Sequence, residues 1–125
     1  MILDTNAVSA LLDGDHALEM ALAVADRHHL PAVTLGEYRY GLKFSRQRQA
    51  LEILLDDLEA ESFLLALDSA TARHYADIRS ELKSDGRPIP ENDIWIAALA
   101  RQHHLPIVSR DEHFDEVRGV RRIGW

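Results

Sequence analysis

Short apolar runs alternate with longer amphipathic segments along the chain. The apolar runs have the length of buried strands, and the segments between them repeat apolar residues at the helical period. This pattern predicts strands over Ile2–Leu3, Pro31–Thr34, Phe63–Leu65 and Pro106–Ser109, with an edge strand over Val120–Ile123. It predicts helices from an N-cap at Thr5 or Asn6 through Leu12, and over His16–His28, Leu35–Phe44, Arg46–Ala60, Ser69–Lys83 and Glu91–His104.

Strands that are separated by helical crossovers predict a parallel sheet covered by helices on both faces. The expected fold class is therefore α/β, with a short, mostly parallel central sheet of four to five strands. A length of 125 residues suits a single domain over residues 1–125. In such folds ligands bind beyond the carboxyl ends of the strands, and this is where we look for chemistry.

The sequence excludes cysteine-based sites and argues against a secreted or membrane-spanning protein. The chain has no cysteine, which excludes disulfides, thiolate zinc sites and cysteine nucleophiles. It opens with Met1-Ile2-Leu3-Asp4 and no basic segment leading into a long apolar run, so we expect no secretory signal. The Ala17–Ala25 stretch is too interrupted to span a bilayer. We therefore expect a cytoplasmic protein that has no membrane partner.

The net charge of −7 argues against a simple polyanion-binding module, because affinity for nucleic acid comes largely from Lys and Arg contacts to phosphate. One basic segment stands against this acidic average, between Glu37 and Glu52. A second, shorter one lies near the C-terminus. Either segment can be solvated surface or can receive an RNA backbone. The first contains Arg39, Lys43, Arg46 and Arg48, and the second Arg118, Arg121 and Arg122.

Four acids occupy the places where the predicted fold brings chain segments together. Asp4 follows the first strand, and Asp111 comes two residues after the strand that ends at Ser109. Glu37 lies in the first turn of the helix after the second strand. Asp93 lies in the first turn of the helix that starts near Glu91. All four can therefore face one rim of the sheet.

Four carboxylates in one pocket raise each other's pKa values unless a cation lies among them. Oxygen ligands without cysteine suit a hard ion such as Mg²⁺ or Mn²⁺. The alternative is that these acids are helix caps and surface charge, which is an ordinary role for an acid near a helix start. The pattern alone leaves both interpretations open.

The same residues belong to motifs that resemble those of the PIN-domain ribonucleases, and within them the VapC-type toxins of bacterial toxin–antitoxin pairs. The resemblance covers essentially the whole chain and includes the family's acid that is followed four residues later by glycine. The motifs are Ile2-Leu3-Asp4-Thr5-Asn6, Glu37-Tyr38-Arg39-Tyr40-Gly41, Pro90-Glu91-Asn92-Asp93-Ile94-Trp95-Ile96-Ala97-Ala98 and Val108-Ser109-Arg110-Asp111-Glu112-His113-Phe114, with the closing Trp125.

The resemblance implies a PIN-like three-layer α/β/α fold and endonucleolytic hydrolysis of RNA that depends on Mg²⁺ or Mn²⁺. It also implies a homodimer and a VapB-like antitoxin that covers the cleft. The metal-binding acids of the family correspond to Asp4, Glu37, Asp93 and Asp111, and a small shift of the last motif would exchange Asp111 for Glu112 or Asp115. Its supporting polar positions correspond to Asn6 and Ser109.

Other functions compete with this interpretation. A PIN-type RNA-processing nuclease that is not a toxin has the same motifs. A receiver-like signalling module also binds Mg²⁺ at strand ends, but it needs a lysine after a strand, and Lys43 and Lys83 fall in predicted helices. An aspartyl-phosphate phosphatase needs a second Asp two residues after the first, where this chain has Asn6. A non-catalytic interaction protein would use the acids only as surface.

Overall fold

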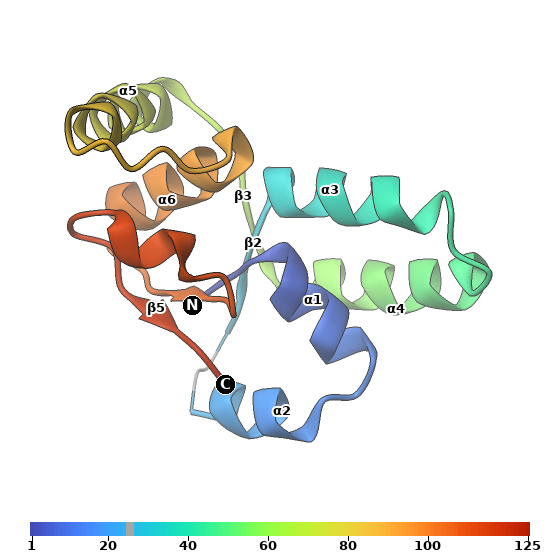
Figure 1. Cartoon of the computed structure of the whole chain (residues 1–125). Coiled ribbons are helices and arrows are strands. Elements are labelled where there is room, and N and C mark those ends of the chain that lie inside the picture. Colours follow the sequence, from blue (N-terminus) through green and yellow to red (C-terminus); the bar gives the residue numbers. More distant parts are fainter. Residues whose placement is uncertain (25–26) are drawn as a thin grey trace.

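A five-stranded parallel sheet in the order β3-β2-β1-β4-β5 runs through the centre of the structure, which is a computed structural model describing residues 1–24 and 27–125 (Figure 1). The strands are β1 (Ile2–Leu3), β2 (His29–Pro31), β3 (Phe63–Leu65), β4 (Ile107–Val108) and β5 (Arg122–Ile123). The helices are α1 (Thr5–Leu12), α2 (His16–Leu22), α3 (Ala32–Leu42), α4 (Arg48–Glu61), α5 (Ser69–Ser84) and α6 (Glu91–His103), with a short 3₁₀ helix, η1 (Glu112–Glu116).

The two central strands are buried on both faces because adjacent side chains of a strand point to opposite sides. Ile2 and Ile107 pack into the core formed with α5, α6 and η1. Leu3 and Val108 pack into the core formed with α1 to α4. The helices thus form a layer on each side of the sheet (Figure 1). The predicted three-layer α/β fold with a parallel sheet is confirmed.

The second strand lies two residues earlier than predicted. The apolar run of residues 30–33 suits a strand or a helix start equally well, and tertiary contacts decide between them. His29 donates its backbone N–H to the carbonyl of Met1, and Pro31 ends the strand and becomes the N-cap of α3. Proline lacks the N–H that a longer ladder needs, but its fixed φ suits the start of a helix. Glu37 is therefore in the second turn of α3 and not in the first.

Two other boundaries also differ from the prediction. Helix α2 ends at Leu22 and not at His28, with Ala23 as its C-cap; residues 25 and 26 of the predicted helix lie outside the described residues. The N-cap of α1 is Asp4, whereas Thr5 is already the first helical residue. The Asp4 side chain makes no capping hydrogen bond, so its carboxylate is not used up in closing the helix.

None of the described helices is long and apolar enough to span a bilayer.

Candidate metal centre

A pocket of about 800 Å³ opens at the carboxyl edge of the sheet, where β1 and β4 end side by side. The two strands deliver Asp4 and Ser109 there directly, and the starts of α1, α6 and η1 converge on the same edge. The structure thus brings together acids that are up to 107 positions apart in the sequence. The lining includes all four predicted acids: Asp4, Glu37, Asp93 and Asp111.

Asp4 is the most buried of these acids, with only 4% of its surface exposed. Burial raises the pKa of its carboxyl group, and the negative charges of Glu37 and Asp111 add to the rise. Ser109 opposes it, because its hydroxyl donates a 2.8 Å hydrogen bond to Asp4 Oδ2 that favours the ionised form. The buried environment of Asp4 therefore disfavours the negative charge of its carboxylate.

Asn6 and Ser109, the two predicted supporting residues, connect the acids. The Asn6 amide donates to Asp4 Oδ2 at 3.2 Å and to the Ser109 hydroxyl at 3.1 Å. Ser109 Oγ also accepts the backbone N–H of Asp111 at 2.9 Å. One hydroxyl thus links the acid after β1 to the acid after β4, so these two side chains are fixed relative to each other.

Asp93 enters the pocket from the first turn of α6, where the partial positive charge of the helix start suits an acid. This acid is nevertheless buried, with only 9% of its surface exposed. Burial, and then the charges of Asp4 and Asp111, raise its pKa to about 6. A pKa raised this far indicates that neither water nor positive charge around Asp93 fully compensates for the neighbouring negative charges.

Glu37 reaches the same pocket from the second turn of α3. The Thr5 hydroxyl donates a 2.6 Å hydrogen bond to Glu37 Oε2, which ties this side chain to the first residue of α1. Helix α3 is itself held against the sheet by Thr34, whose hydroxyl donates to the Leu3 carbonyl at 3.0 Å. The position of Glu37 therefore depends on two hydroxyl groups outside its own motif.

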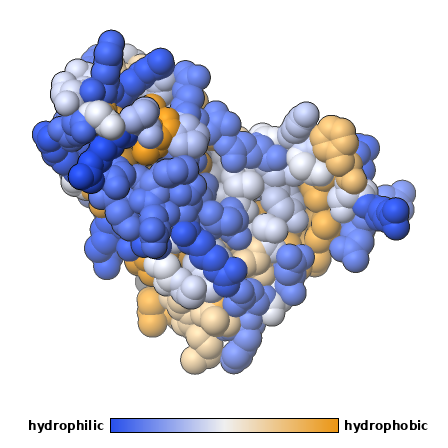
Figure 2. Space-filling model, viewed as in Figure 1, coloured by the Kyte–Doolittle hydropathy of each residue, from blue (hydrophilic) through white to orange (hydrophobic). Residues whose placement is uncertain are grey.

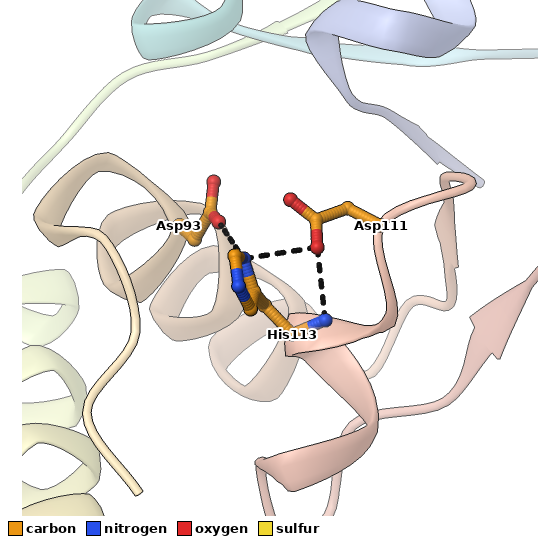
Figure 3. Close-up of side chains that lie close together, drawn as sticks. All are labelled: Asp93, Asp111 and His113. Atoms are coloured by element: carbon orange, nitrogen blue, oxygen red, sulfur yellow. Dashed lines mark hydrogen bonds and ion pairs between the residues drawn. The ribbon is translucent and has the colours of Figure 1, made fainter.

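Asp111 is paired with a residue that the sequence patterns did not single out, His113. Asp111 is the N-cap of η1, and its Oδ1 accepts the backbone N–H of His113 at 2.9 Å. The imidazole Nδ1 of His113 lies 2.9 Å from Asp111 Oδ1 and 3.3 Å from Asp93 Oδ2 (Figure 3). The two acids that were alternatives to Asp111 are not among the pocket's lining residues, and Asp115 is paired with Arg122 at 2.8 Å.

The family assignment follows from comparison with known proteins. The family described as the PIN domain matches residues 1–120. The chain belongs to the PIN-domain family. It is 33% identical to ribonuclease VapC5 of Mycobacterium tuberculosis over 124 residues, covering 98% of this chain and 90% of that protein. It is also 33% identical over 97 residues to the tRNA(fMet)-specific endonuclease VapC of Shigella flexneri, covering 77% and 74% of the two chains.

Solved structures agree with this assignment. The DNA-bound VapBC of Salmonella typhimurium superposes with a TM-score of 0.88 at 26% identity, over 99% of this chain and 96% of that one. The resemblance seen in the motifs is confirmed, and so is the PIN-like fold. The assignment also rules out the receiver and the phosphatase. In this PIN domain Lys43 is the C-cap of α3 and Lys83 lies in the last turn of α5, so neither follows a strand.

PIN nucleases generally depend on a divalent metal, and the residues of this PIN domain fit one. The donors are carboxylate oxygens, and burial, with their mutual repulsion as a smaller cause, raises the pKa values of Asp4 and Asp93. A divalent cation among them would remove that repulsion. His113 is the basic side chain that contacts two of the acids. Arg110 also lines the pocket, but its guanidinium group is paired with Asp15 at 2.9 Å and stacks over the Trp125 ring.

The predicted RNA-binding residues of this PIN domain are not equivalent. Arg39 is paired with Asp56 and Glu59 at 3.0 Å each, and therefore joins α3 to α4. Arg48 is paired with Glu52 at 2.9 Å within α4. Lys43 and Arg46 are exposed, and no acid of the described chain lies within ion-pair distance of either. Of the four, these two are the free cations.

His113 is the residue of this site that sequence reasoning missed. It lies two positions after Asp111, in a segment whose sequence pattern gives no sign of how the two side chains are oriented. The sequence patterns predicted no element here, and the structure has a five-residue 3₁₀ helix. Fully buried Phe114 is the available signal, because a single large apolar residue among polar ones indicates a turn that is anchored in the core.

Proposed function

We propose that this chain is a metal-dependent endoribonuclease and the toxin of a VapBC-type toxin–antitoxin pair. The observation that carries the proposal is the convergence of Asp4, Glu37, Asp93 and Asp111 on one pocket of a PIN domain. Two relatives at 33% identity, a ribonuclease and a tRNA(fMet)-specific endonuclease, support RNA as the substrate.

The reaction is hydrolysis of a phosphodiester bond, in which a water oxygen bonds to phosphorus while the bond to one ribose oxygen breaks in line with it. When bound, Mg²⁺ or Mn²⁺ polarises a phosphoryl oxygen and lowers the pKa of a coordinated water. Asp4 and Asp93, the two most buried acids, would anchor the ion. Asp111 and Glu37 would complete the set of oxygen ligands.

Asn6 and Ser109 keep the anchor in place. Both donate to Oδ2 of Asp4, which leaves Oδ1 of that carboxylate for the ion. Carboxylate ligands that are held in this way by outer hydrogen bonds bind metal more tightly and in a fixed orientation. These two residues are therefore positioning residues in the proposed site.

Lys43 and Arg46 are the side chains best placed to receive the RNA backbone. They are exposed near the C-terminal end of α3, the helix that carries Glu37, and are not neutralised by neighbouring acids. Phosphate contacts contribute affinity and register rather than sequence information. They also offset locally the net charge of −7 that would otherwise repel RNA.

A VapB-like antitoxin is the proposed protein partner, and the toxin is proposed to act as a homodimer. The Salmonella typhimurium structure is a VapBC assembly, which supports the partner. Hydrophobic surface over the α3–α4 end of the molecule adds to this support (Figure 2). Tyr40, Phe44 and Ile53 are 60%, 75% and 63% exposed there, and exposed apolar groups of this size are typical of protein interfaces.

The test uses the purified full chain with a single-stranded RNA, a transfer RNA and a duplex DNA. We expect cleavage of RNA only, in Mg²⁺ or Mn²⁺, and its loss in excess chelator. Cleavage that persists in chelator would contradict the metal mechanism. Growth arrest on expression, relieved by Asp4→Asn and by co-expression of a VapB-like antitoxin, distinguishes a toxin from an RNA-processing PIN nuclease.

A further inference from the structure

The donor atoms of Asp93, Asp111 and His113 all lie within 4.8 Å of one another (Figure 3). Within residues 1–24 and 27–125 this is the only set of three His, Asp or Glu side chains that converges so closely. Neither Asp4 nor Glu37 belongs to it. Asp93 and Asp111 line the pocket, and His113 adjoins them without being one of the lining residues. The tightest potential ligand group therefore contains a nitrogen, and it is not the set of four acids.

The backbone holds the imidazole in this place. Asp111 caps η1 and accepts the His113 N–H, so the two residues form one local turn. Phe114, next in the chain, is fully buried, and Val117 at the end of η1 is 3% exposed. These two anchors fix the turn against the core, and His113 faces the start of α6 at Asp93. The imidazole is therefore held in position by the packing of Phe114 and Val117, although the His113 side chain is itself half exposed.

The distances suit coordination of one ion. Adjacent donors of an octahedral cation with bonds of about 2.1 Å are about 3 Å apart. Nδ1 of His113 lies 2.9 Å from Asp111 Oδ1 and 3.3 Å from Asp93 Oδ2. In Figure 3 both carboxylates turn one oxygen toward the ring. The three donors can thus take neighbouring positions around an ion with small shifts.

We propose that His113 Nδ1 is a direct ligand of the metal, so that the centre is a mixed nitrogen–oxygen site that prefers Mn²⁺ to Mg²⁺. The inference rests on the proposed metal site and adds a ligand outside the four acids. Mg²⁺ strongly favours oxygen donors, whereas imidazole nitrogen stabilises first-row transition metals. The His113 side chain is 50% exposed, so water can accept the N–H of its other ring nitrogen.

The first experiment is pulsed electron paramagnetic resonance of the full chain loaded with Mn²⁺. Direct ligation predicts a ¹⁴N coupling from an imidazole nitrogen in the wild type and in the control His103→Gln, an exposed histidine in the last turn of α6. His113→Asn places an amide oxygen close to the position of Nδ1 and should abolish the coupling. A wild-type spectrum without nitrogen coupling would overturn the proposal.

The second experiment compares metal affinities by titration calorimetry. We expect His113→Ala to weaken Mn²⁺ binding at least about tenfold and Mg²⁺ binding much less. His113→Asn should bind both ions, with the preference moved toward Mg²⁺. If His113→Ala weakens the binding of both ions equally, His113 positions the ligands without binding the ion. If the substitution tightens binding, His113 competes with the ion for Asp93 and Asp111. Either result overturns the proposal.

These readouts separate the inference from the proposed function. A chain that shows nitrogen coupling but does not cleave RNA would refute the function alone. A chain that cleaves RNA in Mn²⁺ without the coupling would refute the ligand alone. Circular dichroism of each metal-free variant establishes that it is folded before its affinity is interpreted.

Discussion

The Ser109 hydroxyl donates a buried 2.8 Å hydrogen bond to Asp4 Oδ2, although the two residues are 105 positions apart. They are adjacent because β1 and β4 pair in parallel and end together. The bond favours the ionised form of a carboxyl group whose pKa burial raises. The strand pairing at the centre of the fold is thus connected directly to the charge state of the proposed metal anchor.

Ser109→Ala should weaken metal binding about tenfold, because it removes an outer hydrogen bond from a ligand. It also removes the acceptor of the Asp111 N–H, so a loss of about 1–3 kcal/mol in the free energy of unfolding is expected. Without the hydroxyl, the pKa of Asp4 rises further, and metal binding should fail at a higher pH than in the wild type. Calorimetric titrations between pH 5 and 8 measure both effects, with exposed Ser80→Ala as the control. Affinities that match the wild type at every pH would show that Ser109 does not support the anchor.

The raised pKa of Asp93 predicts that the stability of the metal-free protein depends on pH. Its pKa is raised from 3.8 to about 6, so folding favours the protonated form. The stability contributed by this group is complete below about pH 4 and is lost as the pH rises through about 6. Asp93→Asn removes the charge and should therefore stabilise the metal-free protein at pH 7, by on the order of 1 kcal/mol after the loss of a favourable helix-start charge.

The same substitution should give a much smaller gain near pH 4, where Asp93 is protonated in the folded protein and only partly ionised in the unfolded chain. Urea denaturation in excess chelator across this pH range measures the difference. Asp57→Asn, at an exposed acid of α4, is the matched control and should leave the pH dependence unchanged. An equal gain at pH 4 and pH 7 would mean that the charge of Asp93 is not the cause.

The basic segment should divide into RNA-binding and structural residues. Lys43→Gln and Arg46→Gln should each weaken RNA binding uniformly across sequences and reduce the slope of log affinity against log salt by about one. Arg39→Gln should instead lower stability by about 1 kcal/mol or less, because it breaks two partly exposed ion pairs between α3 and α4. Binding is measured by fluorescence anisotropy in the Asp93→Asn background, which prevents cleavage. A salt slope that changes for Arg39→Gln and not for Lys43→Gln would reverse this assignment.

Much of the architecture could be predicted because its signals are local. Ile2–Leu3 and Phe63–Leu65 are strands as expected, and α6 begins at Glu91 as expected. Because Asp4 and Asp111 follow predicted parallel strands, the sequence already predicts that they lie at one edge of the sheet. Parallel pairing then requires that residues after neighbouring strand ends lie close together.

What could not be predicted depends on contacts between distant segments. The run from Leu30 to Val33 is apolar throughout, and only pairing with β1 and β3 shows that the strand stops at Pro31. Arg39 carries the same charge as Lys43, and only the packing of α4 against α3 reveals that it is neutralised. His113 required knowledge of a 3₁₀ turn that is too short to leave a periodic pattern.

The central claim is that four acids of one pocket form a single metal site for RNA cleavage. The most direct measurement is single-turnover RNA cleavage in Mn²⁺, paired with Mn²⁺ affinity, for Asp4→Asn, Glu37→Gln, Asp93→Asn and Asp111→Asn. Asp13→Asn, at an exposed acid lining the same pocket, is the control. We expect each of the four variants to lose at least about 100-fold in cleavage, equivalent to about 2.7 kcal/mol in the barrier, and to bind Mn²⁺ more weakly, while the control retains both properties. Wild-type cleavage in Asp4→Asn or Asp93→Asn, or an equal loss in Asp13→Asn, would contradict the claim.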